Sequence, residues 1–493
     1  MFSTLDTKAI LVLALLALYI VFLSVIAWAS SKKITGNNDF LFGSGFGTML
    51  SMFGVAASLF SSFTLQGMPD FFKNHGVAAW VFLGITDVCL AAILLYFGLK
   101  MRQFTRFMAF RNQGHAPKNL TELLKQSGLP KWVIIFFVIA TTLFMIPYVT
   151  IGIKGPAMLM QTAVPWGETH LFWSILIVAL MLLTLLMGGL RAVSVTDVVQ
   201  GMMLMFAVWA IAIFAIHGAG GISQLFQNVA NIEPALLSAP GPVGLFNWQF
   251  LIVSFISIIV IPFVQPQMAT RLLVAKNDKA FARSTMGLCV FAILVILPTL
   301  FIGMRAVDLS QGTQVTSAAN LILNLISHDA PLFFFALFIV GAWAADMSTV
   351  DSQLLAIGTE WRSAMLKEDI QDHPTSNIGV KIGGVFVAIV SLILAQTSFQ
   401  SLILFAINSF VGTSLLLPIV IAASTVCQQR RLALASVSIF SVIVFLLKMF
   451  EVLPKNIAGL KIEIYLYILV GTVMAWAYFT DKSVANWRGK VTV

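Results

Sequence analysis

Charge and cysteine are both scarce in this sequence of 493 residues. Only 10% of the residues are charged and 59% are hydrophobic, a composition typical of a membrane-embedded chain. The three cysteines, Cys89, Cys289 and Cys427, are scattered, so the sequence implies neither a disulfide framework nor a cysteine metal site. The six histidines are isolated, and no paired-carboxylate or Ser/His arrangement occurs. Nothing in these patterns supports an enzyme.

Long hydrophobic runs are what the sequence has in abundance. Runs of about 20 residues, long enough to cross the hydrocarbon core of a bilayer, recur along nearly the whole chain. Segments of this length fit helices, because a membrane-spanning strand needs only about ten alternating residues. The pattern predicts an all-α polytopic membrane protein with about thirteen transmembrane helices. The predicted spans are 8–29, 46–72, 76–100, 131–160, 170–190, 192–217, 247–270, 284–304, 317–358, 378–396, 398–425, 431–450 and 459–480.

The distribution of the 29 Lys and Arg residues predicts the orientation. If the first helix enters from outside, most of them, Arg271 included, fall in loops on one side, and the positive-inside rule makes that side cytoplasmic. The N-terminus is then outside and the C-terminus inside the plasma (inner) membrane. The first run is expected to be a membrane helix and not a signal peptide, because Lys8 alone precedes it and no cleavage pattern follows. The net charge of +9 therefore reflects topology and does not indicate nucleic-acid binding.

The most informative polar segment is 345–352, which follows an apolar run. At about 100° per residue, Ala345, Ser348, Thr349 and Ser352 share one helix face, with Asp351 at its edge. Polar groups at this depth usually face the interior of a bundle or a water-filled path. Hydroxyl and carboxylate oxygens suit a small hard cation, so the segment predicts an ion site inside the membrane.

A second polar segment, 56–69, suggests an interrupted helix. Small and hydroxyl residues lead into Gly67 and Pro69 in the middle of a predicted span. A broken helix exposes backbone carbonyls that transporters use to bind cations and substrate. Tight helix packing explains small residues equally well, but the nearby prediction of an ion site favours the break.

Four further charges lie within predicted spans, and each allows more than one interpretation. Asp197 is either a carboxylate favoured by a helix N-terminus or paired with Arg191, or else a second cation position or exit relay. Asp346 is a second acid of the ion path, a proton carrier or a partner of Lys154. Lys154 could instead extend its ammonium group to the membrane interface. Asp87 either contacts substrate or pairs with a neighbouring helix.

Three motifs resemble the sodium/solute symporter family, and the likeness runs from about residue 39 to the last span. They are Gly-Gly-Leu-Arg-Ala-Val at 188–193 with Thr-Asp-Val-Val-Gln-Gly at 196–201, Met-Ser-Thr at 347–349 with Asp-Ser-Gln-Leu-Leu at 351–355, and Pro-Gln at 266–267 with 271–276 and 280–284. The resemblance implies a leucine-transporter-like core whose first and sixth helices are interrupted, alternating access, and coupling to sodium. It divides the chain into an extra helix and linker (1–45), two inverted five-helix repeats (46–217 and 247–425) joined by an extracellular loop (218–246), and two C-terminal helices with a short tail (426–493).

The resemblance also implies sodium ligands. The common site would use the backbone carbonyls of Ala57, Phe60 and Ala345 and the hydroxyls of Ser348 and Thr349. A second sodium, present in some members, would be bound by Asp197, Ser348, Asp351 and Ser352. Two-ion members have a hydroxyl residue where this chain has Asp351, so the number of ions stays open. Asp346 also departs from the small apolar residue expected at its position.

The implied substrate site follows the first helix break. Hydroxyl groups and a freed helix N-terminus favour a carboxylate there, and the leading prediction is a small carboxylate or an amino acid, since proline, pantothenate and short organic acids are family substrates. Sugar is disfavoured because the chain lacks a Gln at 64 and a matching Glu in the next helix. Sialic acid is disfavoured because Tyr148 stands where those members have Arg. The predicted lining is Ser61, Ser62, Phe63, Thr64 and Gln66, with Tyr148, Trp248, Phe250, Gln265 and Asn408 as further pocket residues.

We therefore expect a secondary active transporter that works as a monomer in a lipid bilayer, with sodium (Na+) as coupling ion. Outside sodium would join the first and eighth core helices, stabilise the outward-open state, and leave toward the cytoplasm by way of Asp197. Two alternatives stay open: a proton-coupled symporter that uses Asp346 or Asp351, whose pKa desolvation would raise, and a non-transporting solute receptor of the same fold. An ion channel ranks last, because the chain lacks a repeated pore element.

Overall fold

The computed structural model of the chain describes residues 4–480 apart from 35, 44–45, 62, 112–113, 165, 167–168, 311–327, 329, 367–375, 398–401 and 426. Ser62 and the beginning of the predicted span 317–358 lie outside the described residues. The predicted all-α architecture is confirmed, since the regular elements among the described residues are helices apart from one short two-stranded hairpin.

The first half of the chain forms eleven named elements. They are α1 (Thr4–Ser31), α2 (Asn37–Phe42), α3 (Thr48–Ala57), the π-helix η1 (Phe63–Gly67), α4 (Met68–His75), the π-helix η2 (Trp80–Ile85), α5 (Thr86–Arg111), α6 (Leu120–Gln126), α7 (Lys131–Ala163), α8 (His170–Gly218) and α9 (Ile222–Ile232).

The second half begins with a 3₁₀ turn and ends with a helical pair behind the hairpin. Its elements are η3 (Pro234–Leu237), α10 (Trp248–Val264), α11 (Pro266–Val274), α12 (Asp278–Ser310), α14 (Leu332–Met365), α15 (Ser376–Ala395), α16 (Leu402–Ser414), α17 (Leu417–Ala422), α18 (Gln428–Met449), β1 (Asn456–Ile457), β2 (Leu460–Lys461) and α19 (Ile462–Thr480).

Among the described residues, nine helices are long and apolar enough to cross a membrane, or ten if the bent pair α10–α11 counts as one span. The 49-residue α8 consists of two helices that meet at Gly189, which has a φ of 51°. A Cβ there would lie 2.3 Å from the Phe40 carbonyl oxygen, so this kink requires glycine. The predicted spans 170–190 and 192–217 are these two helices. The described residues of predicted spans 46–72 and 398–425 form shorter helices, and the total of thirteen stays a prediction.

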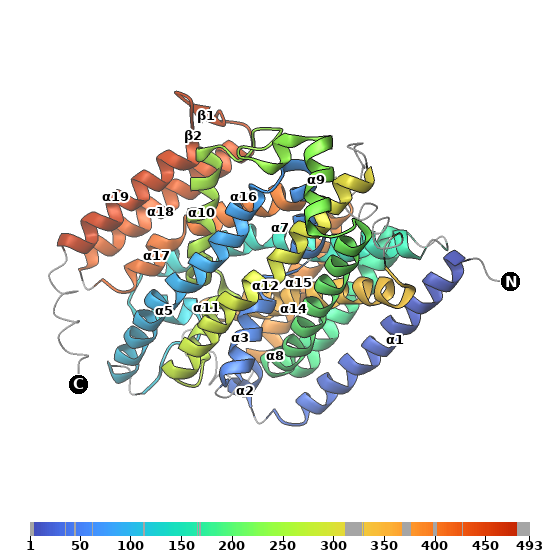
Figure 1. Ribbon diagram of the computed structural model, residues 1–493. Coiled ribbons are helices and arrows are strands. Elements are labelled where there is room, and N and C mark those ends of the chain that lie inside the picture. The colour runs from blue at the N-terminus through green and yellow to red at the C-terminus, as the bar shows by residue number, and fades with distance from the viewer. Residues whose placement is uncertain are drawn as a thin grey trace.

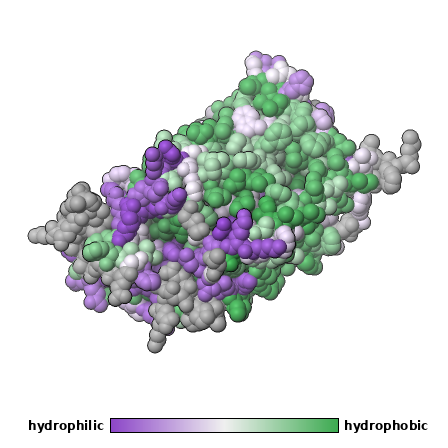
Figure 2. All heavy atoms as spheres, turned by 90° about the horizontal axis from the view of Figure 1, so that it is seen from below, coloured by the Kyte–Doolittle hydropathy of each residue, from purple (hydrophilic) through white to green (hydrophobic). Residues whose placement is uncertain are grey.

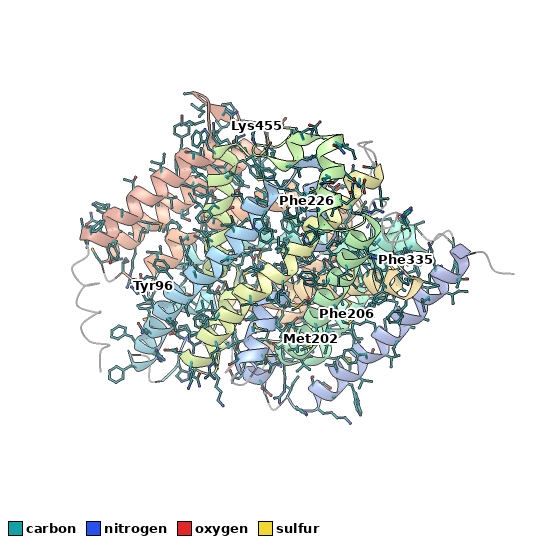
Figure 3. All side chains as sticks on the ribbon, in the orientation of Figure 1. Tyr96, Met202, Phe206, Phe226, Phe335 and Lys455 are labelled. Carbon is teal, nitrogen blue, oxygen red and sulfur yellow. The ribbon has the colours of Figure 1, made fainter. Side chains whose placement is uncertain are left out.

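The helix α14 lies at the centre of the bundle, where it packs against α1, α7, α8 and α15 (Figure 1). In its most apolar stretch 83% of the residues are buried, against 28% for α1 at the periphery. Large apolar residues such as Tyr96, Met202 and Phe206, labelled in Figure 3, are about half exposed on α5 and α8. Seen from the end where α2 lies, hydrophilic side chains gather in one zone beside broad hydrophobic flanks (Figure 2). This is the surface of an integral multi-pass membrane protein.

Two helix breaks confirm the predicted interruptions. The helix α3 ends at Ala57, and residues 58–61, which follow it before η1 and α4, are not helical. The helices α10 and α11 are bent by 52° at Gln265, where the following Pro266 has no N–H to continue the ladder.

One prediction about the second break was wrong. The expected span ended at residue 270 and left Arg271 in a cytoplasmic loop, but α11 continues to Val274 and Arg271 is only 3% exposed. The reason is that a carboxylate inside the bundle pairs with the guanidinium, which hydropathy alone does not reveal.

Candidate functional site

Five buried oxygens meet where the break of α3 faces α14, and we call this set the hydroxyl cluster: the carbonyls of Ala57, Phe60 and Ala345 and the hydroxyls of Ser348 and Thr349. The Thr349 hydroxyl donates to the Ala57 carbonyl at 2.6 Å and contacts the Phe60 carbonyl at 3.3 Å. The Ser348 hydroxyl lies 2.7 Å from the Ala345 carbonyl and 3.4 Å from that of Ala57. The structure therefore brings all five predicted ligands of the common sodium site together.

The local backbone explains why these oxygens are available. The amides of Leu59 and Phe60 both bond to the Ala56 carbonyl, after which the helix stops. The carbonyls of Ala57 and Phe60 then lack helical partners and turn to hydroxyls of α14 instead. A set of neutral oxygens from two helices is a suitable shell for a small hard cation, which would replace these hydrogen bonds.

A second group of polar residues lies further along α14, and we call it the charged cluster: Thr184, Asp197, Arg271, Asp351 and Ser352. The Arg271 guanidinium donates to the Asp197 carboxylate at 2.7 Å and to the Ser352 hydroxyl. The Asp351 carboxylate accepts from the Thr184 hydroxyl at 2.6 Å. Their side chains are buried, and one oxygen of each carboxylate has no partner within the described part of the chain.

The charged cluster contains three of the four residues predicted to bind a second sodium, Asp197, Asp351 and Ser352, and a guanidinium already contacts two of them. The fourth, Ser348, belongs to the hydroxyl cluster. Sequence reasoning missed Arg271 and Thr184 as members. Pro266 was the available signal, because proline favours the first turn of a new helix and that helix would carry Arg271 inward. Gly54 makes room for the arginine, since a Cβ there would lie 1.9 Å from an Arg271 guanidinium nitrogen.

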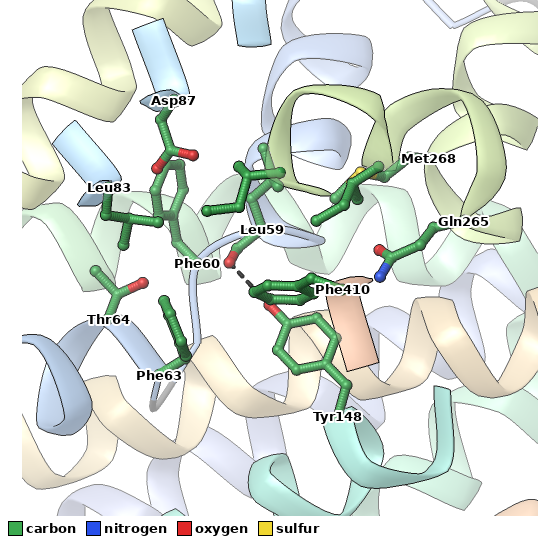
Figure 4. A pocket seen from close by; sticks show the side chains of 12 residues that line it. Leu59, Phe60, Phe63, Thr64, Leu83, Asp87, Tyr148, Gln265, Met268 and Phe410 are labelled. Carbon is green, nitrogen blue, oxygen red and sulfur yellow. Dashed lines mark hydrogen bonds between the residues drawn. The ribbon is translucent and has the colours of Figure 1, made fainter. Parts of the chain in front are cut away.

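A pocket of about 340 Å³, which includes space open to solvent, lies beside the break of α3 (Figure 4). The Tyr148 hydroxyl donates to the Leu59 carbonyl at 3.0 Å and so ties α7 to the broken segment. The polar and aromatic lining residues are Phe60, Phe63, Thr64, Asp87, Tyr148, Gln265 and Phe410, and the aliphatic and thioether ones are Leu59, Leu83, Ile258, Ile261 and Met268.

Four of the predicted substrate residues, Phe63, Thr64, Tyr148 and Gln265, line this pocket. Ser61 and Gln66 are buried nearby in the chain, and Asn408 lies on α16, but none of these three is among the lining residues. Phe250 instead packs against Phe82 and Phe246. Trp248 begins α10 and is 55% exposed, so the structure does not bring it to the pocket.

The remaining intramembrane charges have different surroundings. Lys154 donates to the carbonyls of Ala395 and Thr397 at the end of α15, which agrees with a lysine that reaches toward the helix end. Asp346 is fully buried on α14 opposite Gly152 of α7. Asp87 lines the pocket beside the break of α3.

The chain is similar to known transporters over most of its length. The model of the sodium:solute symporter family matches residues 40–422. The sodium/pantothenate symporter of Escherichia coli is 25% identical over 70% of each chain. The osmoregulated proline transporter OpuE of Bacillus subtilis is 23% identical over 78% of this chain and 76% of its own. A sodium/proline symporter of Staphylococcus aureus is 23% identical over 81% of this chain and 78% of its own.

Solved structures show the same fold. A Na+-coupled sialic acid symporter in a substrate-bound outward-open state has a TM-score of 0.75 at 19% identity, over 96% of this chain and 97% of its own. The transporter MhsT in complex with L-phenylalanine has a TM-score of 0.56 at 12% identity, over 88% and 98% of the two chains. The fold is therefore leucine-transporter-like, with broken helices around a central α14. Together, the family match and the predicted motifs show that this chain belongs to the sodium:solute symporter family and is a sodium-coupled transporter of a small solute.

Proposed function

We propose that the coupling sodium binds in the hydroxyl cluster. The observation that carries this proposal is the convergence of five buried neutral oxygens on the break of α3, from two helices far apart in sequence. No side chain of this cluster carries a positive charge. A sodium ion can therefore bind the five oxygens without displacing a positively charged group of the protein. Sodium bound there joins α3 to α14, as expected for an ion that stabilises one conformation of the carrier.

The membrane potential gives the driving force its scale. One cation that moves inward gains about 2.3 kcal/mol per 100 mV. About 1.4 kcal/mol corresponds to a tenfold solute gradient, so one sodium per cycle sustains useful accumulation. We infer uptake into the cell with the N-terminus outside and the C-terminus in the cytoplasm, and alternating access between inverted repeats 46–217 and 247–425. A functional monomer is expected, because both clusters and the pocket lie within one chain.

For the charged cluster we propose that Arg271 serves as the cation of the conformation described here. Its guanidinium contacts Asp197 and Ser352, two of the four residues that the resemblance assigns to a second sodium. A second sodium would have to compete with it, so we propose one coupling sodium at the hydroxyl cluster. The charged cluster would then connect α8, α11 and α14 along the path by which sodium leaves toward the cytoplasm.

The solute is proposed to bind in the pocket beside the break of α3, and to be a small carboxylate or an amino acid. The buried donors of Thr64 and Gln265 have no partner among the described residues and suit a carboxylate. The names of the relatives agree, because proline and pantothenate both carry one.

Uptake into proteoliposomes tests this proposal. Labelled carboxylates and amino acids are offered under an inward sodium gradient, an inward proton gradient or no gradient. Accumulation of one compound with sodium alone is the expected result. Accumulation that follows the proton gradient and ignores sodium would overturn the assignment of the hydroxyl cluster and turn attention to Asp346 and Asp351.

A further inference from the structure

The pocket beside the break of α3 has one charged side chain among its described lining residues, the carboxylate of Asp87. Asp87 is the second residue of α5 and is 4% exposed. In the part of the chain that the structure describes, no Lys, Arg or His lines this pocket, and no ion pair reaches this carboxylate. A buried carboxylate without a positive partner is costly. A cationic group of a bound solute would supply such a partner.

Two basic side chains of the neighbouring helices are engaged elsewhere. Arg271, on the half-helix after the second break, pairs with Asp197. Lys154, on the same helix as Tyr148, donates to carbonyls at the end of α15. The positive charges of these two residues are thus directed to other partners.

Aromatic rings make up much of the remaining surface. Phe410 packs edge-on against Tyr148 and Phe63, with ring centroids 5.3 Å and 5.9 Å apart. The hydrogen bond from Tyr148 to the Leu59 carbonyl fixes the position of the phenol (Figure 4). Ring faces attract an ammonium group through their quadrupole. A pocket lined by a carboxylate and by fixed rings is a favourable site for a cationic nitrogen.

The opposite side of the pocket offers a hydrogen-bond donor. Gln265 comes from the break between α10 and α11 and lies across the pocket from Asp87 (Figure 4). Its amide oxygen accepts from Gln267 at 2.8 Å, while its amide nitrogen is buried and has no partner among the described residues. The unpaired N–H groups suit an acceptor such as a carboxylate.

We propose that the solute carries a protonated amino group, which Asp87 binds, and a carboxylate or similar acceptor, which the amide of Gln265 binds. This inference rests on the proposed function and narrows it: an amino acid fits the pocket, and a carboxylate without a basic nitrogen does not. Asp87 is then the residue that determines specificity for the amino group.

Matched pairs of compounds test the proposal on the purified full-length protein. Three pairs keep the carbon skeleton and remove the amino nitrogen: alanine and propionate, valine and isovalerate, phenylalanine and 3-phenylpropionate. In the fourth pair, proline and cyclopentanecarboxylate, a CH2 group replaces the ring nitrogen. For each compound we measure the concentration that gives half-maximal thermal stabilisation of the protein in sodium chloride. We expect at least one amino compound to bind at least about tenfold more tightly than its partner. Equal binding within every pair, or no response to any amino compound, would overturn the proposal.

Variants identify the residue responsible. Asp87→Asn should abolish the preference for the amino compound, and Asp87→Glu should restore part of it. Asp70→Asn is the matched control, because Asp70 lies on α4 outside the pocket lining and accepts from Asn74. A preference that survives in Asp87→Asn would contradict the assignment. If a variant does not fold, the pairs measured on the unaltered protein still decide.

Sodium alone separates this inference from the function on which it rests. Stabilisation by sodium chloride over potassium chloride, without solute, reports on the hydroxyl cluster. Asp87→Asn should keep that response while it loses the amino preference. If the unaltered protein showed no stabilisation by sodium chloride over potassium chloride, the sodium site would be contradicted, whatever the matched pairs show.

Discussion

The hydroxyl cluster and the charged cluster lie within two turns of α14, yet they satisfy their polar atoms in opposite ways. In the hydroxyl cluster, neutral hydroxyls donate to carbonyls freed by a helix break, and no ionised group takes part. In the charged cluster, two buried carboxylates share their surroundings with one guanidinium. The first is a set of ligands for a cation from outside the protein. The second already contains a cation of its own.

This difference teaches that counting oxygens does not identify an ion site. Both clusters present buried hydroxyl and carbonyl or carboxylate oxygens inside the helical bundle. A sodium ion that enters the hydroxyl cluster replaces weak neutral hydrogen bonds, whereas in the charged cluster it must break a buried ion pair. Removal of one partner of such a pair leaves an uncompensated charge. The largest expected effect therefore comes from the charged cluster, although we assign sodium to the other.

Replacement of Arg271 should break the charged cluster most severely. Arg271→Gln leaves Asp197 and Asp351 buried without a positive charge, so we expect the free energy of unfolding to fall by about 3–5 kcal/mol. Thermal unfolding in detergent measures the loss. Arg191→Gln is the matched control, because the Arg191–Asp39 pair is longer, at 3.2 Å, and its arginine is 33% exposed. That control should cost less than about 1 kcal/mol. Equal unfolding temperatures would contradict this interpretation.

Substitutions in the hydroxyl cluster should weaken sodium binding and not folding. Ser348→Ala combined with Thr349→Ala removes both hydroxyl ligands and leaves the carbonyls, so the sodium concentration for half-maximal stabilisation should rise at least about tenfold. The control is Thr359→Ala, which removes another buried hydroxyl of α14, one that bonds to its own helix at Leu355. An unchanged sodium response in the double variant would refute the site.

Gly54 offers a way to disturb the charged cluster without touching a charge. Gly54→Ala places a Cβ 1.9 Å from the present position of an Arg271 nitrogen. We expect a loss of about 1–3 kcal/mol from overpacking, most of which should disappear in the Arg271→Gln background. Gly471→Ala on α19 meets no atom within 4 Å and should be neutral in the same unfolding assay. A cost for Gly54→Ala that is the same in both backgrounds would show that it does not act through Arg271.

The sequence allowed the hydroxyl cluster to be predicted more fully than the charged one. Ser348 and Thr349 share a helix face with Ala345, and small residues before Gly67 and Pro69 marked the facing break. These are local patterns, which do not depend on how distant segments of the chain pack together. The position of Arg271 depends on how far α11 continues past residue 270 and on which carboxylate it meets, and both follow from packing between distant segments.

The pocket shows the same limit. Thr64 and Gln265 were predictable because each lies at or just after a break. Trp248 was predicted to line the pocket, but several helical turns separate it from the break and leave it at the exposed end of α10. Asp87 was one of several ambiguous charges, and the packing of α5 against α10 and α11 brings it into the lining of the pocket.

The smallest expected effect makes the sharpest comparison between the clusters. Asp351→Asn removes one of two carboxylates but leaves the Arg271–Asp197 pair intact, so the cluster loses its excess negative charge. We expect a change in the free energy of unfolding of about 1 kcal/mol or less, the value of the hydrogen bond from Thr184. The sodium response should stay within about twofold of the unaltered protein.

The matched control for Asp351→Asn is Thr184→Val, which removes the hydroxyl that donates to Asp351 without a change of charge. Sodium-dependent stabilisation and thermal unfolding are measured on both variants. If Asp351→Asn weakened the sodium response as much as loss of Ser348 and Thr349 does, while Thr184→Val did not, the carboxylate itself would be a sodium ligand. The charged cluster would then bind an ion beside Arg271. An unchanged response confines the coupling sodium to the neutral oxygens, because a ligand that carries a full charge cannot be removed from an occupied cation site without a large loss of affinity.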